Sequence, residues 1–166
     1  MTNKSPSFTT WMNIQLGTGL ITGNDFRESL RKVNFTVGVW GYAILSSSHF
    51  IGSRKKREVE LVQVSIAELG YEYGAARRDI YERAQNLGLR LCPAEVGPYL
   101  RIQYVEQPEG EQILIAMESV FISSRTSGSF AVLGRTEYCG PALDGIDNRP
   151  EDFWNANSRW IFLRRK

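Results

Sequence analysis

The stretch from Ile113 to Met117 constrains the fold most, because its five successive residues, ILIAM, are all apolar. A half-buried strand alternates polar and apolar residues, so a strand without alternation is expected to be covered on both faces. The sequence therefore predicts a central strand here. The preceding run 100–105, LRIQYV, alternates like a strand, and Pro108 and Gly110 lie between the two runs. This arrangement predicts a β-hairpin.

Other segments have strand or loop character. Residues 136–150 are rich in turn-forming types and predict a long loop. The following PEDFW sequence predicts a helical turn that begins at Pro150. Apolar residues that recur with a period of two, or lie in short apolar runs, predict further strands at 12–16, 59–66, 129–135 and 159–164.

Three segments have helical character. Thr22 or Asn24 can cap a helix that begins near Asp25, because their side-chain oxygens accept from free N–H groups of the first turn. Residues 75–88 carry an apolar stripe at helical spacing and end in a glycine, which predicts a second helix. The run 37–45, VGVWGYAIL, favours a short helix over a strand.

The order of these elements is strand, helix, short helix, strand, helix and then mostly strands. That order favours an α+β fold with a largely antiparallel sheet of about five to six strands and two to three helices packed on one face. Regular alternation of strand and helix is missing, so a doubly wound nucleotide-binding fold is not expected. The 166 residues suit a single α+β domain at 9–166 after a loose N-terminal arm at 1–8.

Composition excludes several kinds of site. His49 is the only histidine, which excludes sites built on two or more histidines of one chain. Cys92 and Cys139 are too few for a four-cysteine zinc site or a disulfide framework. The net charge of +2 is too small to identify a nucleic-acid-binding protein by itself. No metal site and no cofactor is predicted.

Hydropathy and the N-terminal residues predict a cytoplasmic protein. Residues 1–12, MTNKSPSFTTWM, lack the basic start and apolar run of a signal peptide. No apolar stretch approaches the roughly 20 residues that cross a bilayer, so no membrane partner is expected.

The segment 89–104, LRLCPAEVGPYLRIQY, places a thiol and a carboxylate between two prolines. With Pro93 at the first position of a one-turn helix, Cys92 becomes the N-cap and Glu95 can reach back to its N–H. A thiol at a helix N-terminus has a lowered pKa, which makes Cys92 with Glu95 a candidate catalytic pair. Free cysteine is also among the most buried residue types, and a purely structural corner is the favoured interpretation.

Cations and tyrosines supply the candidate contacts with a partner. The basic cluster Arg54, Lys55, Lys56 and Arg57 can neutralise phosphates, although charge runs are more often solvated loops. In YEYGAARRD, tyrosine rings could stack on bases while arginines contact the backbone; alternatively, the tyrosines simply pack. The candidates in this second segment are Tyr71, Tyr73, Arg77 and Arg78.

The acidic loop 144–152 is a further candidate. Asp144, Asp147, Glu151 and Asp152 could hold a hard cation or carry out acid–base chemistry. Ordinary turn chemistry explains the same residues, because Asp and Asn favour turns.

Nearly the whole chain resembles a family of small uncharacterised bacterial proteins that share an LxLCPAEVGPxLRxQY segment. The resemblance includes DFRESL at 25–30, VSIAELG at 64–70, LIAMESV at 114–120 and RWIFLRRK at 159–166. It carries no activity across. Members of that family are polar or acidic where this chain has SRKKRE, so the resemblance implies no family-wide role for the basic cluster.

These observations favour a small cytoplasmic binding or accessory domain that acts through a macromolecular partner, either protein or nucleic acid. The alternative is a hydrolase or transferase that uses Cys92 and Glu95 or the acidic loop. A homo-oligomer is a third interpretation, since apolar residues left over from a small core often build a symmetric interface.

Overall fold

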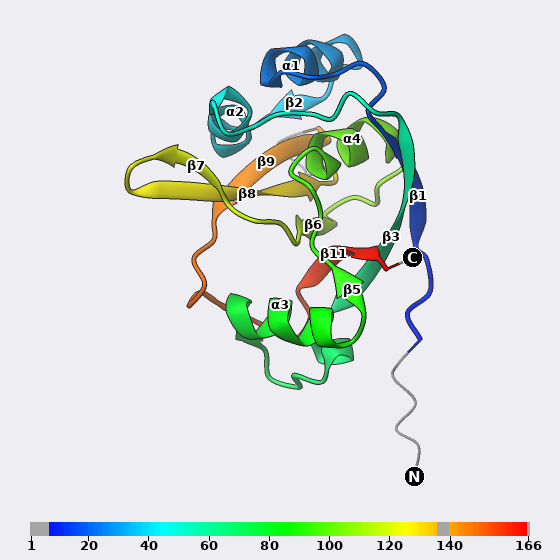
Figure 1. Ribbon diagram of the computed structural model, residues 1–166, viewed down its shortest axis with the longest axis vertical. Coiled ribbons are helices and arrows are strands. Elements are labelled where there is room, and N and C mark those ends of the chain that lie inside the picture. The colour runs from blue at the N-terminus through cyan, green and yellow to red at the C-terminus, as the bar shows by residue number, and fades with distance from the viewer. Residues whose placement is uncertain (1–6, 136–139, 166) are drawn as a thin grey trace.

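The structure is a computed structural model that describes residues 7–135 and 140–165 (Figure 1). Its helices are α1 (Gly23–Lys32), α2 (Val39–Ser46), α3 (Arg77–Asn86), α4 (Val96–Gln103) and the short 3-10 turn η1 (Ala67–Leu69). Its strands are β1 (Met12–Leu16), β2 (Thr36–Val37), β3 (Arg57–Ser65), β4 (Ala75–Ala76), β5 (Leu89–Arg90), β6 (Gln112–Ile115), β7 (Val120–Ser123), β8 (Thr126–Leu133), β9 (Ala142–Asp147), β10 (Phe153–Trp154) and β11 (Arg159–Arg164).

The main sheet is mixed. Its strands follow the order β1-β3-β11-β6-β8-β9-β2, with β5 also paired to β11 and β7 to β8. Most neighbours are antiparallel, whereas β11 with β6 and β2 with β9 are parallel. β4 and β10 pair separately as a short antiparallel ladder.

Helices cover both faces of this sheet. Figure 1 shows α1, α2 and α4 at one end of the molecule and α3 at the opposite end, with the sheet between them. The buried side chains accordingly form two clusters, one containing Phe26 and Tyr99 and the other containing Ile80. Neighbouring residues of β11 divide between them, with Ile161 in the first cluster and Phe162 in the second. The alternation of a central strand thus supplies both cores.

The predicted α+β class is correct only in outline. The expected sheet of five to six largely antiparallel strands is wrong, because the described residues form a nine-stranded mixed sheet. The expected two to three helices on one face are also wrong, because these residues form four α-helices that lie on both faces. Helices on both faces bury both sets of alternating side chains of a central strand. Such a strand therefore has few polar residues.

The helix expected near Asp25 is confirmed as α1. Thr22 is its N-cap, and the Asp25 N–H donates to the Thr22 hydroxyl at 3.2 Å. The Asp25 carboxylate in turn accepts from the Thr22 N–H at 2.8 Å. This reciprocal capping box satisfies two donors and fixes where the helix begins. The short helix within 37–45 is confirmed as α2.

The predicted hairpin is wrong, because 100–105 contributes to α4 and not to a strand. Pro98 lies in the first turn of α4, where its missing N–H has no intrahelical partner to lose. Gly97 lets the helix pack closely on β8, since a Cβ there would lie 2.7 Å from Cβ of Phe130. In the helix these alternating residues no longer share a face, and Leu100 is fully buried whereas Ile102 is only partly buried.

The predicted loop at 136–150 is wrong over 142–147, which form β9, while 136–139 lie outside the described residues. Gly145 lies in this strand where α2 packs directly on it. A side chain would not fit there, since a Cβ would lie 2.6 Å from Cδ1 of Ile44. The helical turn expected at Pro150 is also wrong, since Phe153 and Trp154 form β10. Within the described part of the chain, no helix is long and apolar enough to span a bilayer.

Candidate functional site

The turn between the two prolines directs its thiol into the core. Cys92 is 4 % exposed, and its Sγ lies 3.5 Å from the carbonyl oxygen of Ile161. The Cys92 N–H donates to the carbonyl of Ala116 at 2.7 Å. Burial raises the pKa of the Cys92 thiol well above its ordinary value, which favours the protonated form.

The predicted one-turn helix with Cys92 as N-cap is wrong. α4 begins at Val96, and its N-cap is Glu95, whose backbone is already helical. The Cys92 N–H, which the Glu95 carboxylate was expected to accept, bonds to Ala116 beyond the end of β6. The Cys92 N–H therefore pairs with the sheet and does not donate to the Glu95 carboxylate, as the predicted capping box required.

Glu95 anchors the basic segment instead. Its side chain is almost fully buried, and its two oxygens accept from Ser53 N–H at 2.7 Å and from the Arg57 guanidinium at 3.3 Å. A backbone amide and a guanidinium together compensate for the burial of a carboxylate. These two bonds hold the segment 53–57 against the start of α4.

Gly17 fixes the same segment from the other side. Its φ is +67°, and a Cβ at this position would lie 2.1 Å from the carbonyl oxygen of Lys55. Only glycine combines that backbone conformation with so close an approach. The GTG sequence at 17–19 thus lets two backbones meet and helps to position the exposed side chains of Arg54, Lys55 and Lys56.

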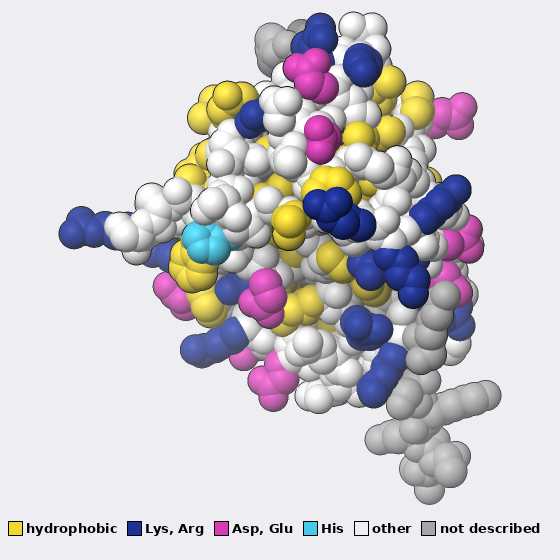
Figure 2. Space-filling view, turned by 45° about the horizontal axis from the view of Figure 1, so that its top comes forward, with side chains coloured by type: hydrophobic (Ala, Val, Ile, Leu, Met, Phe, Trp, Pro, Cys, Tyr) yellow, Lys and Arg dark blue, Asp and Glu magenta, His cyan; other side chains and the backbone are white. Residues whose placement is uncertain are grey.

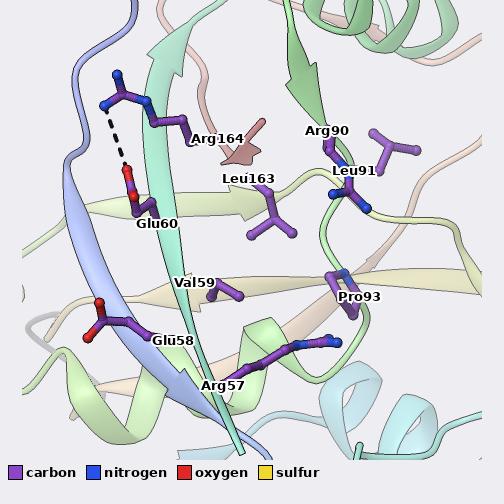
Figure 3. Close-up of a pocket in the computed structure, with 9 residues that line it drawn as sticks. All are labelled: Arg57, Glu58, Val59, Glu60, Arg90, Leu91, Pro93, Leu163 and Arg164. Carbon is purple, nitrogen blue, oxygen red and sulfur yellow. Dashed lines mark ion pairs between the residues drawn. The ribbon is translucent and has the colours of Figure 1, made fainter. Parts of the chain in front are cut away.

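A pocket of about 400 Å³ opens beside this segment, and Figure 3 shows the side chains that line it. β3 lies on one side of the pocket, the segment that follows β5 lies on the other, and Leu163 projects between them. The apolar lining is Val59, Leu91, Pro93 and Leu163, and the charged lining is Arg57, Glu58, Glu60, Arg90 and Arg164. We call this hollow the arginine pocket.

The three guanidiniums of the arginine pocket differ in their partners. Arg57 donates to Glu95, and Arg164 forms an ion pair with Glu60 at 3.6 Å (Figure 3). Arg90 is exposed and has no hydrogen-bond or ion-pair partner within 7–135 and 140–165. Because its donors are not occupied by the protein, Arg90 is the group best placed to bind an added anion.

The cationic surface continues past the pocket. Arg90 also lines a second hollow of about 360 Å³ together with Arg165. Figure 2 shows Lys and Arg side chains gathered on the side of the molecule that carries β1 and β3, with acidic side chains among them. The cations of this surface are Arg54, Lys55, Lys56, Arg57, Arg90, Arg164 and Arg165, and the nearby carboxylates are Glu58, Glu60 and Glu95.

The tyrosine candidates do not form a stacking platform beside the basic segment. Tyr71 packs partly buried against the core around α3, and its hydroxyl donates to the Asp79 carbonyl at 3.2 Å. Tyr73 is 83 % exposed but does not line the arginine pocket. Of the two tyrosine rings predicted to stack on bases, the Tyr71 ring therefore packs partly within the protein.

The arginine candidates of the same segment are also separate from the pocket. Arg77 is 9 % exposed, and its guanidinium lies over the ring of Tyr81 at 5.0 Å. Arg78 is exposed and pairs with Asp79 at 3.5 Å. Figure 1 places the start of α3, where both arginines lie, far from the start of β3. The structure therefore divides the predicted cations between two ends of the molecule.

The acidic loop 144–152 does not gather its carboxylates. Asp144 accepts from the backbone N–H of Gly41 at 3.0 Å, which joins β9 to α2. Asp152 accepts from the backbone N–H of Arg149 at 2.8 Å. Nowhere in the described residues do three His, Cys, Asp or Glu side chains lie close enough together to hold a metal ion.

Sequence reasoning missed Arg90, Arg164 and Arg165. Each stands in or beside a strand and far from the basic cluster in sequence. Only Arg164 lies in a predicted strand, 159–164, and an arginine in a predicted strand is too common a signal to identify a site. Only the pairing of β5 with β11, and of β11 with β3, brings them to the segment 54–57.

Comparison with protein-family models, with curated proteins and with solved structures finds no match for this chain. The resemblance to small bacterial proteins stays a prediction.

Proposed function

We propose that this protein is a non-catalytic binding module that holds an anionic macromolecule at the arginine pocket. The observation that carries the proposal is Arg90, an exposed guanidinium without a partner in the described residues, next to Arg57 and Arg164. A guanidinium presents its donors in a fork that matches carboxylate and phosphate groups. Val59 and Leu163 add apolar contact in the same hollow.

The extent of the cationic surface supports a ligand larger than a single ion. Arg54, Lys55 and Lys56 precede the pocket, and Arg165 lies beyond it with Arg90. Charges arranged over such a distance steer and hold an extended anion, and their effect weakens as salt rises.

Burial of Cys92 and Glu95 supports binding over catalysis. A nucleophilic cysteine must be deprotonated and must reach its substrate, whereas Cys92 is buried with a raised pKa. Glu95 is committed to Ser53 and Arg57. The proposal includes a cytoplasmic location, in which a free thiol such as Cys92 remains reduced.

The proposal is tested by titrating the protein with an oligoglutamate peptide and, separately, with an oligothymidine strand at low and at physiological salt. We expect at least one probe to bind, with an affinity that falls as salt rises. Arg90→Ala should weaken that binding roughly tenfold, because a hydrogen bond to a charged group contributes about 1.5–3 kcal/mol.

Arg125→Ala is the matched control, since Arg125 is also exposed but lies at the turn between β7 and β8. This change should leave the affinity within about twofold. Absence of binding to either probe at low salt, or equal losses from Arg90→Ala and Arg125→Ala, would exclude the arginine pocket as the binding site.

A further inference from the structure

The arginine pocket is a gap in the sheet, because the two neighbours of β3 overlap only at Leu61. β1 pairs with Arg57–Leu61, and β11 pairs with Leu61–Ser65 on the opposite side. β5 pairs with the last residues of β11, on the side of β11 away from β3. Arg164, the last residue of β11, comes next in register opposite Glu60, so past the end of β11 the described residues leave Arg57–Val59 facing the segment 91–93 with no strand between them.

The gap lies in line with β11, between β3 and the chain that follows β5. Neighbouring strands lie about 4.8 Å apart, so β3 and β5, which flank β11, are separated by roughly twice that spacing. The edge Arg57–Val59 is three residues long, or roughly 10 Å at the rise of an extended chain. A segment that enters the gap in the direction of β11 would run antiparallel to β3.

The β3 edge offers backbone groups to such a segment. Gln15, which lies opposite Glu58, exchanges both of its backbone groups with the Gln103 side chain outside β1, at 2.9 Å each. Residues opposite one another at such an antiparallel position both point their backbone groups away from the partner strand. The Glu58 N–H and C=O thus point into the gap, and no other described residue bonds them.

The charges of the gap differ between its two faces. Arg57 and Val59 share a face with Leu61, and Leu163 pairs with both Leu61 and Arg90, so all five side chains project to one side. Glu58, Glu60 and Arg164 project to the other side, where Arg164 pairs with Glu60. One face is therefore cationic over an apolar lining, and the other is mixed.

We propose that the ligand is an extended acidic segment of a partner protein, which adds to the sheet beside β3 and directs carboxylates at alternate positions toward Arg57 and Arg90. This inference rests on the proposed function and specifies its ligand. Strand addition takes its affinity from the backbone and its specificity from alternate side chains. The pocket lining contains no aromatic ring for base stacking, which favours a peptide over a nucleic acid.

A peptide that alternates Thr and Glu tests the inference against an isomer of the same composition with its Glu residues in one block. The alternating peptide should bind at least about tenfold more tightly, since only it presents carboxylates to both arginines. Replacing two of its Thr residues by Pro should lower its affinity by a similar factor, because proline cannot donate to the ladder.

Two protein variants isolate the backbone contribution. Glu58→Pro removes the N–H that points into the gap and leaves the β1 ladder intact, and Glu58→Ala removes the same charge but keeps the N–H. Glu58→Pro should bind the alternating peptide about tenfold more weakly than Glu58→Ala. In the unmodified protein, the Glu58 amide should exchange with solvent more slowly when this peptide is bound, which decides the question even where Glu58→Pro does not fold.

Equal binding of the two peptide isomers, or an unchanged exchange rate of the Glu58 amide in the complex, would overturn strand addition. If oligothymidine binds in an Arg90-dependent way and neither peptide does, the proposed function stands and the peptide inference fails. If no probe depends on Arg90, the proposed function itself fails.

Discussion

Two regions of the molecule share the segment Leu89–Glu95 and use it in opposite ways. On the inner side, Cys92 and Glu95 are almost fully buried and hydrogen-bonded within the protein. On the outer side, Arg90 and Pro93 line the arginine pocket. The residue types most often linked with chemistry here stabilise the fold, and an isolated arginine remains available to a ligand.

Substitutions on the two sides of this segment should therefore affect different properties, stability on the inner side and binding on the outer side. A change on the inner side removes contacts that the folded chain needs, and its main effect is on the free energy of unfolding. A change at an exposed residue without partners removes none of these contacts. If the two regions are as distinct as the structure indicates, substitutions two to five residues apart will have effects of different kinds.

Glu95→Ala should produce the largest loss of stability, about 3 kcal/mol, because it leaves the Ser53 N–H and the Arg57 guanidinium without their acceptor. Denaturant unfolding measures the change. Glu28→Ala is the control: Glu28 pairs with Arg31 on the surface, so its loss should cost under about 0.5 kcal/mol. Similar losses in the two variants would mean that Glu95 does not anchor the basic segment.

Alkaline pH should weaken the inner region next. The Tyr81 hydroxyl donates to the Met117 carbonyl and accepts from the Met117 N–H, beside the bridge between Met117 and Cys92. Burial raises the pKa of Tyr81 to about 12, against about 10 in the unfolded chain. Because the folded state keeps the proton to higher pH, this stabilisation is complete below pH 10 and is lost as the pH rises through about 12.

The shift in the pKa of Tyr81 corresponds to roughly 2.7 kcal/mol at most. Between about pH 10 and pH 12, the free energy of unfolding should therefore fall more steeply for the unmodified protein than for Tyr81→Phe. Tyr42→Phe serves as the control, since Tyr42 is 55 % exposed. Parallel curves for the unmodified protein and Tyr81→Phe would show that Tyr81 titrates alike in the folded and unfolded states.

Local sequence signals predicted the elements that are stabilised locally. Thr22 and Asp25 belong to one capping box, so the start of α1 could be read from four neighbouring residues. The alternation at 12–16 predicted β1 in the same way. In both cases the side chains that define the element are close together in sequence.

Elements whose environment comes from distant residues could not be predicted. β9 contains Asp144 and Gly145, which resemble a turn until α2 packs on them. The alternation at 100–105 predicted a strand, but the chain there forms a helix that packs closely on distant Phe130 through Gly97. Arg90 likewise joins the candidate site through strand pairing, which no local pattern records.

Cys92→Ser should have a smaller effect on the inner region, about 1–2 kcal/mol of lost stability. The substitution puts a hydroxyl into a buried site where the thiol lies 3.5 Å from the Ile161 carbonyl, so the new group is poorly satisfied. Thermal or denaturant unfolding measures the loss. The native thiol should also resist alkylation until the protein unfolds, and rapid labelling of the folded protein at neutral pH would contradict the burial of Cys92.

Arg90→Glu should have the smallest effect on stability and the sharpest effect on function. Arg90 has no partner in the described part of the chain, so its replacement should change the free energy of unfolding by less than about 0.5 kcal/mol. The same change replaces the guanidinium of Arg90 in the arginine pocket by a carboxylate, whose negative charge should repel an anionic ligand. Affinity for the anionic probe should therefore fall by more than the roughly tenfold expected for Arg90→Ala.

Stability and affinity should both be measured for Arg90→Glu, because the inner region determines the first and the outer region the second. Unfolding reports whether the outer side of Leu89–Glu95 contributes to the fold, and titration with the anionic probe reports whether it binds. Arg125→Glu makes the same change in net charge at the turn between β7 and β8. If only Arg90→Glu loses stability, the outer side of the segment also contributes to the fold. If both variants lose the same affinity, binding depends on the net charge of the protein and not on the arginine pocket.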